Sequence, residues 1–122
     1  MRSIIITGAI LAGLAVIFGA FGAHGLKSKI SPEDLSIFET GVKYQMYHAL
    51  GLILMGILGF HFPERVIQLP STLMSLGILI FSGSLYILVV GGVRWMGAIT
   101  PIGGLCLTAG WLLLAYNLYK DH

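Results

Sequence analysis

The positions of the charged residues constrain this chain more than any other feature of its sequence. The seven basic and five acidic residues all lie at the edges of four uncharged stretches, which cover 3–26, 44–63, 66–93 and 95–119. A helix needs roughly 20 apolar residues to cross the hydrocarbon core of a bilayer. Each stretch is therefore long enough for one crossing and too short for two.

The composition excludes several classes of protein. Hydrophobic residues make up 57% of the 122 residues and charged residues only 10%, whereas a soluble domain usually carries about 25% charged residues. This excludes a soluble enzyme and a nucleic-acid-binding protein, and the net charge of +2 is too small to indicate a nucleic-acid partner. A single cysteine excludes a disulfide framework and a multi-cysteine metal site. We expect no metal and no cofactor.

The uncharged stretches predict an all-α integral membrane protein that forms one domain over 1–122. We expect four transmembrane helices, at about 4–23, 44–62, 71–91 and 101–119, packed in a compact bundle. The first stretch is interpreted as a retained helix, because its apolar core exceeds the 7–15 residues that are usual in a signal peptide.

A short amphipathic helix is expected between the first and second crossings. Ser31 and Pro32, followed by two acidic residues, are typical of a helix start with an N-cap, a proline in the first turn and favourable negative charge. The chain would enter the bilayer near Gly41, either through a bend or as one continuous helix. Thr100 and Pro101 repeat the cap pattern before the fourth crossing, and Pro63 and Pro70 bracket the second connection.

The positive-inside rule, which counts Lys and Arg on each membrane face, gives an orientation by a single charge. We call the face that carries the first and third connections side B, and the face that carries both termini and the second connection side A. Side B holds four cations and side A three, so both termini are predicted to lie outside. The cations are Lys27, Lys29, Lys43 and Arg94 on side B, and Arg2, Arg65 and Lys120 on side A.

Small residues form stripes along three of the expected crossings. Because lipid tails are as apolar as leucine, transmembrane helices associate through close backbone approach along such stripes. The stripes indicate either packing within one four-helix bundle or the seam of a homo-oligomer. They consist of Gly8, Ala12, Ala15, Gly19 and Gly22 in the first helix, Gly77, Ser84 and Gly91 in the third, and Gly103 and Gly110 in the fourth.

Polar residues gather toward side B, where they form a candidate site. Since an isolated polar side chain is unfavourable in hydrocarbon, these residues are expected to face the bundle interior. They would form either a hydrogen-bonded structural cluster, with His48 held by Gln45, Ser82 or Tyr86, or a small cavity that binds a lipid headgroup, a solute or a proton. The candidate residues are His24, Tyr44, Gln45, His48, Ser82, Tyr86 and Thr100, and the serines at 71 and 75 would extend the polar stripe of the third helix.

Four runs of the sequence resemble one known family. They cover 18–26, 40–50, 81–86 and 99–104, and a Gly-Trp pair follows at 110–111. The chain is similar to the domain-of-unknown-function 423 family of small bacterial membrane proteins, which includes eukaryotic transmembrane protein 256. The resemblance covers essentially the whole chain and implies a four-helix protein of the inner cell membrane, without supplying an activity.

The sequence supports three functional hypotheses. The first is a non-enzymatic bundle that binds membrane lipids or a partner protein. The second is a subunit of an oligomeric small-solute or ion transporter or channel, although no Asp or Glu lies within the crossings to couple protons. The third is a membrane enzyme, with Tyr44 and His48 as its only acid–base pair and with no nucleophile, carboxylate pair or metal-ligand set.

Overall fold

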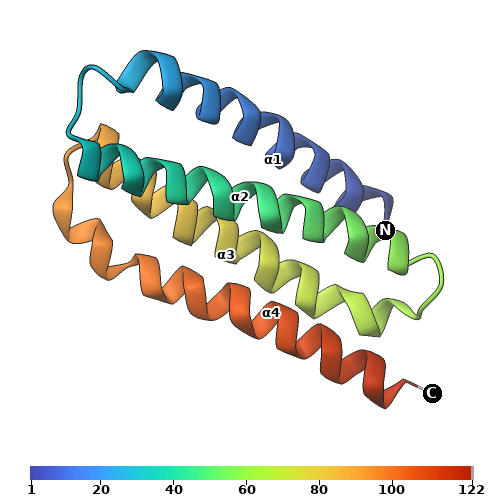
Figure 1. Cartoon of the computed structure of the whole chain (residues 1–122). Coiled ribbons are helices and arrows are strands. Elements are labelled where there is room, and N and C mark those ends of the chain that lie inside the picture. Colours follow the sequence, from blue (N-terminus) through green and yellow to red (C-terminus); the bar gives the residue numbers. More distant parts are fainter. Residues whose placement is uncertain (122) are drawn as a thin grey trace.

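The computed structural model describes residues 1–121 and contains helices but no strand within that range. Four long helices run back and forth: α1 (Arg2–Phe21), α2 (Pro32–Leu58), α3 (Glu64–Val90) and α4 (Thr100–Lys120) (Figure 1). Two short helices occupy the connections at side B. They are the π-helical turn η1 (Gly22–Leu26) after α1 and the 3-10 helix η2 (Arg94–Ala98) before α4.

Three helical segments are long and apolar enough to cross a membrane: Arg2–Leu26, Glu64–Val90 and Arg94–Lys120. These segments correspond to three of the four expected crossings. The remaining helix, α2, is as long as α3. Its lower mean hydropathy arises from the charged residues of its first three turns and from Gln45 and His48, which are buried inside the protein.

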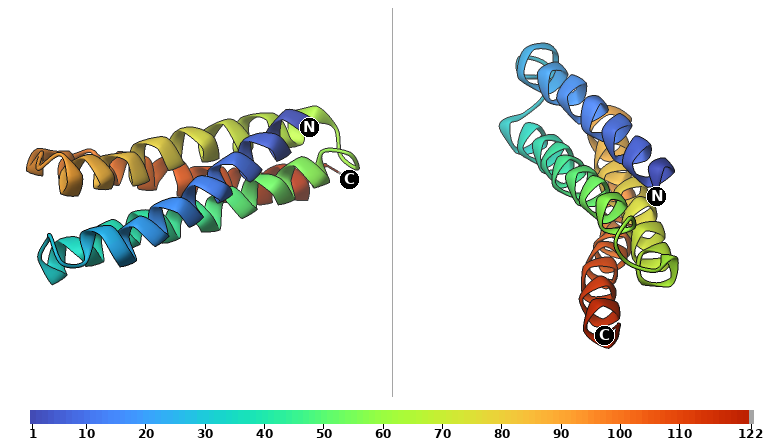
Figure 2. Two further views of the ribbon diagram at one scale, coloured as in Figure 1. Left: turned by 90° about the horizontal axis from the view of Figure 1, so that it is seen from above. Right: turned by 90° about the vertical axis from the view of Figure 1, so that its right-hand side faces the viewer.

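The helices form an open row in chain order, and the expectation of a compact bundle was wrong in this respect. The extensive helix contacts are those of α1 with α2, α2 with α3 and α3 with α4, and α1 and α4 lie at opposite edges of the row (Figures 1 and 2). The stripes of small residues explain this arrangement. α1 and α4 each carry a single stripe of small residues, so each helix can approach only one neighbouring helix closely along that stripe.

The α1 stripe packs against α2, as the intramolecular reading of the small residues predicted. A Cβ atom on Gly8 would lie 2.7 Å from the carbonyl oxygen of Ala49 on α2, and one on Gly22 would lie 2.9 Å from the ring of Phe38. Gly19 is less tightly enclosed, since its nearest neighbour would lie at 3.5 Å.

The stripes of α3 and α4 meet in the same way. A Cβ atom on Gly103 would lie 2.3 Å from the backbone nitrogen of Phe81, and one on Gly77 would lie 2.6 Å from Leu107. Gly8, Gly22, Gly77 and Gly103 are therefore covered within one chain, whereas Gly91 is exposed at the end of α3.

α2 begins where the sequence predicts and then continues without a break. The hydroxyl of Ser31 accepts a hydrogen bond from the backbone N–H of Asp34 at 3.1 Å, and Pro32 opens the helix. The amphipathic segment and the second expected crossing are thus one helix rather than two. Gly41 lies inside α2, where the absence of a side chain leaves room for the ring of Tyr86 from α3.

α3 begins at Glu64, seven residues before the expected start at 71, because Pro70 lies inside the helix instead of ending it. A proline in a helix leaves the carbonyl four residues earlier without its usual N–H partner. That carbonyl belongs to Val66, and the side-chain amide of Asn117 on α4 donates to it at 3.1 Å. A neighbouring helix thus satisfies the carbonyl, which the sequence around Pro70 could not reveal.

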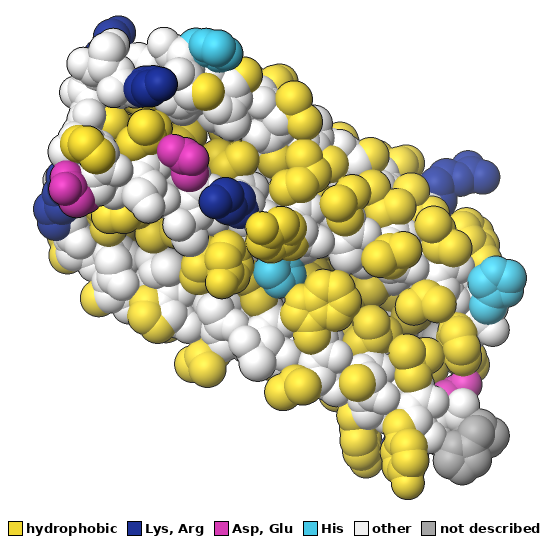
Figure 3. Space-filling model, in the orientation of Figure 1, with side chains coloured by type: hydrophobic (Ala, Val, Ile, Leu, Met, Phe, Trp, Pro, Cys, Tyr) yellow, Lys and Arg dark blue, Asp and Glu magenta, His cyan; other side chains and the backbone are white. Residues whose placement is uncertain are grey.

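The buried core lies between α2, α3 and α4, and a smaller apolar cluster lies at side B. Large hydrophobic side chains also cover much of the outer surface, and charged side chains gather mainly toward the two ends of the face shown in Figure 3. Such a surface suits contact with lipid. The core consists of Leu52, Met55, Val66, Ile67, Met74, Ile78, Leu107 and Leu114, and the side B cluster of Leu26, Phe38, Leu88 and Val89.

Candidate functional site

Gln45 links three helices through its side-chain amide. Its Nε2 donates to the carbonyl of Leu11 on α1 at 2.8 Å, and its Oε1 accepts a hydrogen bond from the hydroxyl of Tyr86 on α3 at 2.6 Å. One turn away, Ser82 of α3 donates to the carbonyl of Gly41 on α2 at 2.6 Å. Of the two predicted alternatives, a structural cluster and a binding cavity, these contacts correspond to the hydrogen-bonded structural cluster.

His48 does not join this cluster, so the expectation that Gln45, Ser82 or Tyr86 would hold it was wrong. Its Nδ1 lies 2.7 Å from the carbonyl oxygen of Tyr44, one turn earlier in the same helix. Its ring stacks near the ring of Tyr44 and tilts against that of Trp111 on α4, with centroid distances of 5.9 and 5.8 Å. His48 therefore belongs to the α2–α4 side of the protein, whereas Gln45 faces α1 and α3.

Thr100 forms a separate pair at the start of α4. Its hydroxyl lies 2.6 Å from that of Ser84 and 3.3 Å from the carbonyl oxygen of Met96. The N-cap of α4 is Ile99, without a side-chain cap, so Thr100 joins α3 to α4 and does not cap the helix as expected. His24 is exposed in η1, and its side chain makes no hydrogen bond within residues 1–121.

The predicted site therefore separates into four parts. Gln45, Ser82 and Tyr86 lie together between α1, α2 and α3, whereas Tyr44 and His48 lie on the α4 side. Thr100 pairs with Ser84, and His24 lies at the surface of side B.

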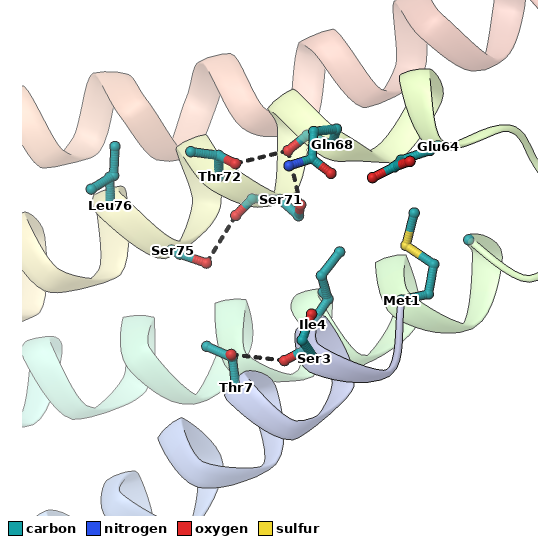
Figure 4. Close-up of a pocket in the computed structure, with 11 residues that line it drawn as sticks. Met1, Ser3, Ile4, Thr7, Glu64, Gln68, Ser71, Thr72, Ser75 and Leu76 are labelled. Carbon is teal, nitrogen blue, oxygen red and sulfur yellow. Dashed lines mark hydrogen bonds between the residues drawn. The ribbon is translucent and has the colours of Figure 1, made fainter.

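A polar hollow that the sequence reasoning missed lies at side A, between the first turns of α1 and α3 (Figure 4). We call it the hydroxyl hollow. It has a volume of about 510 Å³. Its polar lining side chains are Ser3 and Thr7 from α1, and Glu64, Gln68, Ser71, Thr72 and Ser75 from α3. The serines at 71 and 75 thus form the side A end of the polar stripe that runs along α3 toward side B.

The hydroxyl groups of this hollow offer mainly acceptor oxygens. Ser71 and Thr72 both donate to the carbonyl of Gln68, at 3.0 and 2.9 Å, while Ser75 donates to the carbonyl of Ser71 and Thr7 to that of Ser3 (Figure 4). A hydroxyl has one proton and two lone pairs, so each of these groups retains acceptor capacity. No Lys or Arg side chain lines the hollow, and Glu64 adds a carboxylate.

The sequence did contain a signal for this hollow. On the third helix, positions 64, 68, 71, 72 and 75 recur at intervals of three and four residues, and positions 3 and 7 do the same on the first. Such spacing places side chains on one helix face. The signal was missed because Glu64 and Gln68 were assigned to a connection ending at Pro70.

An apolar hollow of about 340 Å³ lies on the same pair of helices near side B, and we call it the aromatic hollow. Phe18 of α1 and Tyr86 of α3 meet there edge to face, with ring centroids 5.2 Å apart. Eleven residues separate Thr7 from Phe18 and Ser75 from Tyr86, which is close to three helical turns and a rise of roughly 16 Å. The two hollows therefore lie on the same face of each helix.

An ion pair ties the third connection to the start of α2 at side B. The guanidinium of Arg94 donates to both carboxylate oxygens of Asp34, at 2.9 and 2.6 Å. These hydrogen bonds, together with the positive charge, hold the pKa of Asp34 below its ordinary value of 3.8. At side A, the guanidinium of Arg65 donates to one carboxylate oxygen of Asp121.

Comparison with known proteins finds relatives along the whole chain. The family model described as "Protein of unknown function (DUF423)" matches residues 18–104. UPF0382 membrane protein SH2409 of Staphylococcus haemolyticus is 48% identical over 120 residues, and UPF0382 membrane protein YwdK of Bacillus subtilis is 47% identical over 125 residues. Each alignment covers 98% of both chains. No solved structure matches this chain.

Proposed function

We propose that this chain, which belongs to the domain-of-unknown-function 423 family of membrane proteins, is a non-enzymatic lipid-binding protein of the cell membrane. The observation that supports this proposal is the alignment of the hydroxyl hollow and the aromatic hollow along α1 and α3. A polar hollow at one membrane face and an apolar hollow further along the same two helices together suit an amphiphile.

The proposal includes four membrane crossings, with α2 as the fourth. α1 and α3 are both candidate spans and run in the same direction, with α2 returning between them (Figure 1). If α1 and α3 cross in the same sense, the chain has to cross back through α2. The polar side chains of Gln45 and His48 are compatible with such a crossing because both are buried and hydrogen-bonded.

In the proposed binding mode, the lipid headgroup occupies the hydroxyl hollow and one acyl chain follows α1 and α3 toward Phe18 and Tyr86. The rise of roughly 16 Å from Thr7 to Phe18 and from Ser75 to Tyr86, at the facing edges of the two hollows, is close to the thickness of one hydrocarbon leaflet, about 15 Å. Gly83, which lies between the hollows along α3, leaves open space beside the helix, since a Cβ atom there would have no neighbour within 4 Å.

The lining chemistry favours a headgroup that donates hydrogen bonds. Among the side chains that line the hydroxyl hollow, acceptor oxygens outnumber donors, and only Ser3 and Gln68 keep free donor groups. An ammonium headgroup with N–H groups would pair with these oxygens and with the Glu64 carboxylate. Phosphatidylethanolamine has such N–H groups, and phosphatidylcholine has the same charge without them.

Competition between these two lipids tests the proposal. We expect the protein, purified in mild detergent and examined by native mass spectrometry, to retain phosphatidylethanolamine several-fold more than phosphatidylcholine. The double variant Thr7→Val/Ser75→Ala should lose this preference. Thr40→Val is the matched control, because Thr40 makes the same type of bond to its own helix outside the hollow. Equal retention of the two lipids by the unmodified protein would refute the headgroup assignment.

A second variant tests the path of the acyl chain. Gly83→Leu should reduce retention of both lipids, because the new side chain occupies the open space beside α3. Gly13→Leu is the control, since Gly13 on α1 is also free of neighbours within 4 Å. If both variants retain lipid as the unmodified protein does, the chain does not follow this path.

We also propose that both termini lie outside, as the excess of cations on side B predicts. Ser28 lies exposed at side B. In a Cys106→Ala background, a Ser28→Cys variant should therefore resist a membrane-impermeant thiol reagent in intact cells and react after the membrane is opened. Labelling in intact cells would reverse the orientation.

A further inference from the structure

A separate hollow between α2 and α4 is lined by three aromatic rings and one histidine. It has a volume of about 480 Å³, and its walls include Tyr44, His48, Phe81 and Trp111. The rings of Tyr44 and Phe81 stack with centroids 4.5 Å apart. On α4, the indole ring of Trp111 packs against the backbone of Gly51 on α2, where a Cβ atom would lie 2.9 Å from the ring. The hollow therefore has flat, largely apolar walls.

The hydrogen bond of His48 determines which of its nitrogens carries a proton in the neutral ring. Nδ1 lies 2.7 Å from the carbonyl oxygen of Tyr44, and a carbonyl can only accept. Nδ1 must therefore be the donor, which leaves a lone pair on Nε2 of the neutral imidazole.

Nε2 of His48 has no hydrogen-bond partner within residues 1–121. In that part of the chain, every side-chain nitrogen or oxygen that is fully buried has a partner. Nε2 is therefore not fully buried, and since His48 lines the α2–α4 hollow, this acceptor is accessible from there. Thr108, also in the lining, donates its own proton to the carbonyl of Gly104 at 2.9 Å and adds a second acceptor oxygen.

We propose that the α2–α4 hollow binds the hydroxylated ring of a lipid-soluble phenol or hydroquinone, whose O–H donates to Nε2 of His48. A flat ring matches the aromatic walls, which favour stacked or edge-to-face contacts. The O–H supplies the donor that Nε2 of His48 lacks within residues 1–121. An acyl chain would fill the same space but would leave Nε2 without a partner. This site is independent of the lipid groove along α1 and α3.

Tryptophan fluorescence can test the site, because the chain has only two tryptophans, at 95 and 111. In a Trp95→Phe background, emission reports Trp111 alone. The protein, in phosphatidylcholine nanodiscs, is titrated with a decyl-substituted hydroquinone and with its dimethyl ether, which lacks the O–H groups. We expect saturable binding of the hydroquinone about fivefold tighter than that of the ether, as one net hydrogen bond predicts.

Two variants separate the histidine from the hollow. His48→Phe keeps a ring in the wall but removes Nε2, so it should bind the two ligands equally. Gly104→Leu should abolish saturable binding of both ligands, because its side chain enters the hollow where a Cβ atom has only ordinary contacts with Phe81. Gly13→Leu is the matched control and should retain the fivefold preference.

Imidazole ¹⁵N NMR of the unmodified sequence gives a measurement that does not depend on the folding of a variant. Addition of the hydroquinone should shift an unprotonated Nε2 signal and leave its protonated Nδ1 partner nearly unchanged. Equal binding of hydroquinone and ether by the Trp95→Phe protein, absence of saturable binding, or a proton on Nε2 of His48 would each overturn the proposal.

Discussion

The hydrogen bond between Gln45 and Tyr86 should make a measurable contribution to stability. Gln45→Leu keeps a side chain of similar size but removes two contacts between helices, the bond to the Leu11 carbonyl and the bond from the Tyr86 hydroxyl. Hydrogen bonds between transmembrane helices contribute about 0.6 kcal/mol on average and up to about 1.7 kcal/mol. We therefore expect Gln45→Leu to lower the free energy of unfolding by roughly 1–3 kcal/mol.

A double-mutant cycle isolates the shared bond. Tyr86→Phe removes only that bond and should cost about 0.6–1.7 kcal/mol. Each single variant loses the shared bond, and the double variant loses it only once. The sum of the two single-variant losses of unfolding free energy should therefore exceed the loss in the double variant by about 0.6–1.7 kcal/mol. The assay is reversible unfolding in mixed micelles with increasing dodecyl sulfate, followed by circular dichroism.

The matched control for this cycle is Thr40→Val. The Thr40 hydroxyl donates to the carbonyl of Ser36 in its own helix at 3.0 Å and joins no other helix. Its removal should change the free energy of unfolding by less than about 0.5 kcal/mol. A coupling energy of zero between Gln45→Leu and Tyr86→Phe would refute the conclusion that this bond holds α2 to α3.

Three further predictions concern other parts of the fold. Asn117→Leu should destabilise the protein by about 1–3 kcal/mol in the same unfolding assay, because the Val66 carbonyl loses its donor; Pro70→Ala, which restores a backbone N–H, should recover most of the loss. Gly8→Leu should cost about 1–3 kcal/mol through overpacking and lower the thermal midpoint in detergent, whereas Gly13→Leu should not. The lowered pKa of Asp34 means that its ion pair stabilises the protein above pH 3.8 and is lost as the pH falls through the folded-state pKa. The thermal midpoint should therefore fall more steeply in acid for the unmodified protein than for Asp34→Asn.

The long helices were predictable because a helix that crosses the bilayer needs a continuous apolar stretch, which can be recognised from local composition alone. A stretch without charge and of sufficient length predicts a helix whatever its neighbours are, and the start of α2 at Ser31 and Pro32 followed from the local chemistry of helix caps. The errors came where a second helix decides the outcome. Pro70 could be assigned to a helix interior only with knowledge that Asn117 of α4 reaches the Val66 carbonyl.

The candidate site was harder to predict because helix periodicity defines a face and does not identify the helix opposite. Gln45 and His48 are three residues apart and both buried, yet Gln45 reaches α1 and α3 while His48 lies against Trp111 of α4. Sequence reasoning grouped them by depth in the membrane. Their separation depends on the arrangement of the helices: α1 and α3 meet the side of α2 that carries Gln45, whereas Trp111 of α4 reaches α2 at His48.

The choice of hydrogen-bond partner distinguishes polar groups that hold the fold from those available for binding. Gln45, Ser82 and Asn117 bond across helices, so their polar atoms serve packing. Thr7, Ser75 and Thr108, like Nδ1 of His48, bond to carbonyls of their own helices and leave acceptors accessible in hollows. An acceptor exposed within the membrane gains most from a donor that the lipid tails cannot supply. Polar groups that bond only within their own helix are therefore the ones we expect to bind a ligand.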